Sequence, residues 1–217
     1  SAPVVADEGI QADHRRPLLI PDGSGRATLV YSRFTGTAWH LFARRLENGV
    51  FTDMNGGNAI DSGVDTPVMV SAGAHLGDGR LVVAFLQDNG FRQAVLMSVC
   101  SNGSWTTASP ESSMDDPTGG RSDAVAMTAM PNGSVAVVFV QTVAGADSRL
   151  FASAFDGTNW TKMNGGAAID SADLGFPTRI TAVARQDGRL LVTYLEEDNN
   201  TGVQRVFAAV VGASSIE

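Results

Sequence analysis

The sequence predicts an all-β protein in which four copies of one roughly 54-residue unit form the four blades of a single closed β-propeller. A glycine in a turn-forming cluster recurs at Gly25, Gly79, Gly133 and Gly188, at intervals of 54, 54 and 55 residues. A short apolar stretch follows every one of these turns, and no helical period of useful length is present. Four-stranded antiparallel sheets repeated along a chain at such a spacing are typical of propeller blades.

The turns predict tight hairpins, because Asn-Gly and Asp-Gly pairs accept the positive φ that such turns require. The stretch after each turn ends in an aromatic residue, and residues 81–85 and 135–139 are apolar almost throughout. A strand that is covered on both faces has this pattern, so we expect these strands to lie between neighbouring sheets. The four aromatic residues are Tyr31, Phe85, Phe139 and Tyr194.

Three more strands complete each unit. One precedes the hairpin turn, at residues 17–20, 67–70, 124–127 and 177–180, and one follows, at 40–43, 94–97, 150–153 and 205–208. A fourth strand is expected to start at the large apolar residues Phe51, Trp105 and Trp160, which we expect to be buried between blades.

The phase of the repeat predicts how the ring closes. The chain ends after a third strand, and Ser1–Val5 fits the missing fourth, so the N-terminal strand is expected to complete the last blade and remove an exposed edge. The result is a single domain, 1–217, with repeats at about 6–52, 53–106, 107–161 and 162–217 plus 1–5. Two alternatives are a pair of immunoglobulin-like sandwiches and a larger ring shared between two chains.

Composition excludes several kinds of partner. The net charge of −8 argues against nucleic acid, which needs a basic face. No apolar run approaches the ~20 residues of a membrane span. Cys100 is the single cysteine, and the three histidines occupy different positions of the repeat. We therefore expect no disulfide within the chain, no metal site and no cofactor.

The turn before one fourth strand resembles the Asp-box of sialidase-type propellers, Ser-x-Asp-x-Gly-x-x-Trp. The matching stretch here runs from Ser153 to Trp160, but Asp156 directly precedes Gly157. The resemblance implies a superfamily that is secreted and often handles glycans, and hence a secreted, periplasmic or cell-surface location. It does not imply sialidase activity, because that family's Arg-Ile-Pro element is absent and no catalytic motif occurs in the chain.

Candidate binding residues follow from the geometry of a ring. The loops that lead into the innermost strand of each blade, and those between its second and third strands, share one end of the ring, where residues distant in sequence converge. Arginine can fork onto carboxylate or hydroxyl groups, and phenylalanine offers a stacking face. The predicted ligand-binding residues are Arg15, Arg16, Asp65, Asp123 and Phe176 from the first set and Arg33 and Asp88 from the second.

Acidic residues elsewhere have structural interpretations. Asp61 and Asp170 recur in register, which favours a role in the turns, and residues 196–200 are expected to form a solvated loop, with a calcium site as the alternative.

These observations lead to one functional hypothesis and two alternatives. The first is a non-enzymatic, extracytoplasmic binding or scaffold propeller that recognises carbohydrate or protein through one loop face. The alternatives are a glycan-processing hydrolase on the same fold and a structural subunit of a larger assembly.

Overall fold

The computed structural model describes residues 14–63, 66, 68, 71–88, 92–107, 115, 119–143, 148–171, 175–198 and 201–212. These residues form four antiparallel sheets, each made from consecutive strands of the chain. The first sheet has the order β1 (His14–Pro21), β2 (Ala27–Phe34), β3 (Trp39–Glu47) and β4 (Val50–Asp53).

The other sheets repeat this order. The second contains β5 (Ser71–His75), β6 (Leu81–Asp88), β7 (Gln93–Ser101) and β8 (Ser104–Thr107). The third contains β9 (Ser122–Ala129), β10 (Val135–Thr142), β11 (Ser148–Phe155) and β12 (Trp160–Lys162), and the fourth contains β13 (Thr178–Ala184), β14 (Leu190–Asp198) and β15 (Val203–Val211). Short 3₁₀ turns follow β4 and β12, η1 (Asn55–Gly57) and η3 (Asn164–Gly166). No helix in the described part of the chain could span a membrane.

The repeated glycines close the first hairpin of each sheet. Gly25, Gly79, Gly133 and Gly188 have φ values of 84°, 86°, 85° and 78°. A residue with a Cβ rarely adopts this left-handed conformation, which explains why glycine recurs at the interval that sets the repeat.

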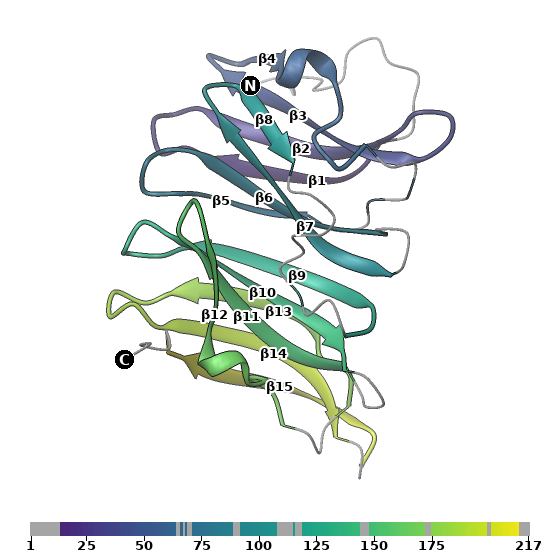
Figure 1. The fold of residues 1–217 in the computed structure, drawn as a ribbon, viewed down its shortest axis with the longest axis vertical. Coiled ribbons are helices and arrows are strands. Elements are labelled where there is room, and N and C mark those ends of the chain that lie inside the picture. Colours follow the sequence, from purple (N-terminus) through teal and green to yellow (C-terminus); the bar gives the residue numbers. More distant parts are fainter. Residues whose placement is uncertain are drawn as a thin grey trace.

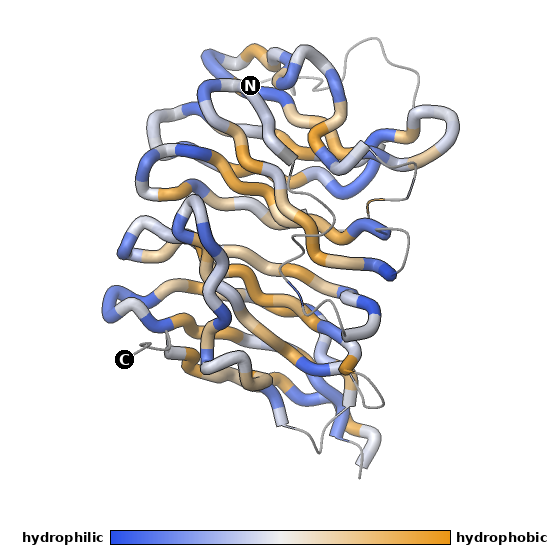
Figure 2. Tube along the Cα trace, viewed as in Figure 1, coloured by the Kyte–Doolittle hydropathy of each residue, from blue (hydrophilic) through white to orange (hydrophobic). Residues whose placement is uncertain are grey.

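The four sheets stack face to face in an open row, with the first and fourth sheets at opposite ends of the long axis (Figure 1). Neighbouring sheets pack mainly through their first strands, β1 on β5, β5 on β9 and β9 on β13. The apolar residues are concentrated in the strands inside the row, whereas the turns at the strand ends are largely hydrophilic (Figure 2). This repeated packing of consecutive antiparallel sheets is the blade arrangement of a β-propeller.

Each junction between sheets follows one rule of alternation. On β10, Val137 and Phe139 face the second sheet, whereas Ala136 and Val138 face the fourth. All four side chains are at most 3% exposed. The apolar runs predicted from the sequence are therefore confirmed as strands covered on both faces.

The turn tryptophans are half-buried. Trp160 stacks on Phe155 with ring centroids 4.8 Å apart, and it packs against the core between the second and third sheets. Trp105 packs in the same way against the core between the first two sheets. Both rings therefore cover the outer rim of a junction instead of lying wholly inside it.

Ring closure within one chain is not confirmed. In the described part of the chain the fourth sheet has three strands, and its packed face is toward the third sheet. The predicted pairing of Ser1–Val5 with the last blade lies outside the described residues.

Candidate ligand-binding edge and cavity

The loops between second and third strands and the starts of the first strands share one edge of every sheet, here called the loop edge (Figure 1). The register of the first sheet demonstrates this, because Arg15 at the start of β1 lies opposite Ser32 near the end of β2. The hairpins that join β1 to β2, and their equivalents, lie at the opposite edge, here called the turn edge.

Two predicted residues, Arg15 and Arg33, each stack on an aromatic ring at the loop edge of the first sheet, on opposite faces of that sheet. The guanidinium carbon of Arg15 lies 4.4 Å from the ring centroid of Trp39. Phe34 lies next to Trp39, with 5.7 Å between ring centroids, and is 38% exposed.

Arg33 stacks in the same manner on the other face of the sheet, because it follows Ser32, the residue that lies opposite Arg15. The guanidinium carbon of Arg33 lies 3.5 Å from the ring centroid of Phe42. The stacking holds each planar fork in a fixed orientation.

The other predicted residues do not take part in either stack. Asp123 forms an ion pair with Arg121 at 2.7 Å, and Phe176 is 45% exposed beside the fourth sheet, at the far end of the row. Asp88 ends β6, where its carbonyl oxygen accepts a hydrogen bond from Thr66. Asp65 lies outside the described residues.

Arg16 has a local structural explanation. It adopts a φ of 53° at a bulge between Arg15 and Leu18, and Arg179 adopts a φ of 48° at the equivalent bulge of β13. Because this conformation recurs in two sheets, it is a feature of the blade and does not by itself indicate a ligand site.

Three buried aspartates, one after the fourth strand in each of the first three sheets, are hydrogen-bonded to the third strand of their sheet. The carboxylates of Asp61, Asp115 and Asp170 accept hydrogen bonds from the backbone N–H groups of Leu41, Val95 and Leu150, at 2.7, 3.2 and 2.9 Å. Each carboxylate also lies next to a basic side chain, and the partners are His40, Arg92 and Arg149. These contacts agree with the structural role expected for Asp61 and Asp170.

Glu196 is buried, which corrects the expectation that residues 196–200 form a solvated loop. Its side chain is buried on β14, 1% exposed, and is not part of a solvated loop. Neither carboxyl oxygen has a hydrogen-bond partner. Burial, and next the charge of Asp170, raise the pKa of Glu196 to about 7. Because the group is closed off from solvent, it cannot reach a polysaccharide as a catalytic acid.

The residue at the equivalent position of the second sheet shows why a neutral Glu196 fits this buried place. Gln87 stands at the same place in the second sheet, where its Oε1 accepts hydrogen bonds from Ser62 and its Nε2 donates to the carbonyl of Thr66. A protonated Glu196 resembles that neutral amide. Burial first, and next the negative charges that Glu196 and Asp170 carry when ionised, raise the pKa of the nearby Tyr194 to about 12.

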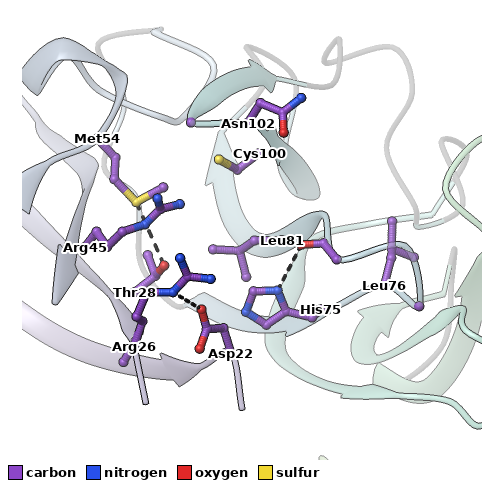
Figure 3. A pocket seen from close by; sticks show the side chains of 14 residues that line it. Asp22, Arg26, Thr28, Arg45, Met54, His75, Leu76, Leu81, Cys100 and Asn102 are labelled. Atoms are coloured by element: carbon purple, nitrogen blue, oxygen red, sulfur yellow. Dashed lines mark hydrogen bonds and ion pairs between the residues drawn. The ribbon is translucent and has the colours of Figure 1, made fainter. Parts of the chain in front are cut away.

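A cavity of about 320 Å³ lies on the turn edge between the first two sheets (Figure 3). Arg26 lines it and donates to Asp22 at 2.8 Å, and Arg45 enters from the first sheet. His75 enters from the second sheet, with its Nε2 buried and unpartnered. Burial raises the pKa of the Cys100 thiol, which keeps it neutral.

Sequence reasoning missed this cavity because its lining comes from turns of two different repeats. The signal in the sequence is the set of charged residues beside Gly25 and Gly79, among them Asp22, Arg26 and Arg80. Among the described residues, no group of three or more His, Cys, Asp or Glu side chains could hold a metal ion at either place.

No protein-family model and no curated protein sequence matches the chain. Solved structures do match its fold. The Hadza microbial sialidase Hz136 superimposes with a TM-score of 0.65 at 12% identity, over 93% of this chain and 46% of the sialidase. The chain thus spans about half of that protein.

Two further structures cover different shares of their own length. The endo-arabinase of Bacteroides thetaiotaomicron gives a TM-score of 0.58 at 13% identity, over 99% of this chain and 80% of the arabinase. The Trypanosoma rangeli sialidase gives 0.59 at 12% identity, over 91% of this chain and 36% of the sialidase. Identities this low establish a common fold and no more.

Proposed function

We propose that the chain is an extracytoplasmic carbohydrate-binding module that recognises its ligand through the loop edge of the first sheet. The observation that carries the proposal is the stacking of Arg15 on Trp39 beside the exposed ring of Phe34. Aromatic rings supply flat apolar surfaces, and a fixed guanidinium supplies forked donors for hydroxyl or carboxylate groups. The structural neighbours act on carbohydrates by name, which favours a sugar over a protein ligand.

We propose binding and not catalysis because of where the carboxyl groups of the described residues lie. A glycosidase needs two carboxyl groups that reach opposite sides of a glycosidic bond. Among the described residues, Glu196 is the carboxyl whose pKa is raised toward neutrality, and it is buried. The loop edge of the first sheet contributes arginine and aromatic side chains instead.

The test is a binding assay with sialylated and arabinose-containing oligosaccharides. We expect Arg15→Ala and Phe34→Ala each to weaken binding of the best ligand about tenfold or more, which corresponds to about 1.4 kcal/mol. Arg189→Ala, at an exposed turn-edge arginine, is the matched control and should leave the affinity unchanged.

The same assay separates the alternatives. Weakening by Arg45→Ala alone would move the site to the turn-edge cavity. Cleavage of an oligosaccharide by the wild-type chain would support the hydrolase, and an absence of binding to every sugar would refute the proposal.

A further inference from the structure

The first sheet departs from the repeat where it borders the turn-edge cavity. Three residues after each repeated glycine, a cross-strand pair on the second and third strands faces the following sheet. In the second and third sheets this pair is apolar, Val82 with Val99 and Ala136 with Ala154. In the first sheet it is Thr28 with Arg45. Small apolar side chains satisfy the packing at this position, so packing does not explain a charged residue there.

The second sheet departs from the repeat on the other side of the same cavity. Cys100 stands where the later sheets have larger apolar residues, and His75 stands where they have alanine. The equivalents are Phe155 and Val211 for Cys100, and Ala129 and Ala184 for His75. The smaller side chain of the cysteine leaves space at this junction, and the histidine makes its wall polar.

Arg45 supplies a positive charge that no neighbouring carboxylate balances. Arg26 also lines the cavity, but its Nε donates to Asp22 at 2.8 Å, and the same turn arginine recurs as Arg80 and Arg189. Among the described residues, no carboxylate forms an ion pair with Arg45. The arginine and aspartate side chains of the cavity therefore leave one positive charge in excess.

His75 supplies an unpaired hydrogen-bond acceptor. Its Nδ1 lies 3.3 Å from the carbonyl oxygen of Gly79, and because a carbonyl can only accept, Nδ1 carries the proton in this contact. In the neutral ring Nε2 then has a free lone pair, and this atom is buried without a partner. A buried acceptor that is left unpaired costs free energy, so a hydroxyl group that donates to it is stabilising.

We propose that the turn-edge cavity binds a small hydroxy acid, a molecule that carries a carboxylate beside hydroxyl groups. The carboxylate pairs with the guanidinium of Arg45, and a hydroxyl group donates to Nε2 of His75 from the other side of the cavity (Figure 3). One excess positive charge matches a single carboxylate and not the two charges of a phosphate group.

The size of the cavity limits the ligand. Its volume of about 320 Å³ lies at the lower end of the range for small-molecule sites, which is about 300–1,000 Å³. The ligand is therefore a single small molecule or the end of a longer one.

The experiment is a titration of the full chain followed by the NMR chemical shifts of its backbone amides. The probes are D-glucuronate, D-glucose, which lacks the carboxylate, and acetate, which lacks the hydroxyl groups. We expect D-glucuronate to bind at least about tenfold more tightly than either of the other two. The titrations use the Arg15→Ala chain, so that binding at the loop edge does not contribute.

Two variants return the cavity to the pattern of the other junctions. Arg45→Val removes the charge, and Cys100→Phe fills the space with the residue that the third sheet has there. Each should weaken D-glucuronate binding at least about tenfold. Because the repeat uses both residues at these positions elsewhere, circular dichroism should show both variants folded. Arg189→Ala removes the turn arginine of the fourth sheet and is the control, with unchanged affinity.

Three outcomes would overturn the proposal. They are no binding of D-glucuronate, equal binding of D-glucuronate and D-glucose, and D-glucuronate binding that survives both Arg45→Val and Cys100→Phe. None of them bears on the loop-edge proposal, since Arg15 is absent from the chain that is titrated. Conversely, oligosaccharide binding that ignores Arg15→Ala and Phe34→Ala would refute the loop-edge site and leave the hydroxy-acid site standing.

Discussion

Individual carboxylates in this protein are placed by hydrogen bonds to nearby backbone and arginine groups. Asp78 and Asp187 each accept the backbone N–H and the side chain of the arginine two residues later, and these bonds lower the pKa of both carboxyls. Glu196 differs from these two, because it is buried beside Asp170 and has no hydrogen-bond partner.

The raised pKa of Glu196 predicts a pH dependence of stability. Its folded-state pKa of about 7 lies above the ordinary value of 4.5, so the folded state holds the proton more tightly than the unfolded chain. Its contribution is therefore fully present below about pH 4.5 and is lost as the pH rises through 7. Ionisation costs the folded state up to about 3 kcal/mol.

We expect Glu196→Gln to remove this dependence. In urea unfolding, the variant should gain up to about 3 kcal/mol relative to wild type between pH 5 and pH 8, because an amide cannot ionise. Glu197→Gln, at the exposed neighbouring position, is the control. Parallel stability curves for the wild type and the Glu196→Gln variant would contradict this assignment of the proton.

At the scale of the strands and turns, the repeat was predictable because glycine turns and apolar runs are local signals. The bulges at Arg16 and Arg179 were not, since arginine rarely adopts positive φ and nothing in the residue type indicates it. The stacking of Arg15 on Trp39 was missed for a similar reason. It depends on the cross-strand register, which one strand alone does not determine.

The hairpin turns of the second and third sheets are in close contact at Gly77 and Gly133. The N–H of Gly77 donates to the carbonyl of Gly133 at 2.7 Å, and a Cβ at Gly77 would lie 2.7 Å from the Cα of Gly133. Gly77→Ala should therefore force the second and third sheets apart and cost about 1–3 kcal/mol.

Denaturant unfolding measures this cost. Gly212→Ala is the matched control, because a Cβ there meets open space and the backbone is not in the left-handed region. Equal unfolding midpoints for the two alanine variants would show that the turns of the two sheets do not constrain each other.

At the scale of the whole molecule, the sequence predicted both the blades and a closure by Ser1–Val5, and of the two the structure describes the blades. The order of strands and the two-sided burial of β6 and β10 follow from hydrophobic pattern. Closure is different, because it depends on the angle between successive sheets, to which many side chains contribute a little. A repeat therefore predicts that each junction exists, but not the number of sheets that completes a ring.

The predicted ligand-binding residues share an edge of the sheets but do not lie together. Arg15, Arg33 and Phe176 share the loop edge, as the strand order requires, but the first and fourth sheets lie at opposite ends of the row (Figure 1). Convergence of these residues at one mouth needs a closed ring.

The most direct test of the account is the affinity of the Arg15→Ala and Phe34→Ala variants for the oligosaccharide that the wild type binds best. The account predicts that each variant binds at least about tenfold more weakly, whereas Arg189→Ala binds like the wild type. Unchanged affinity in both loop-edge variants would contradict it.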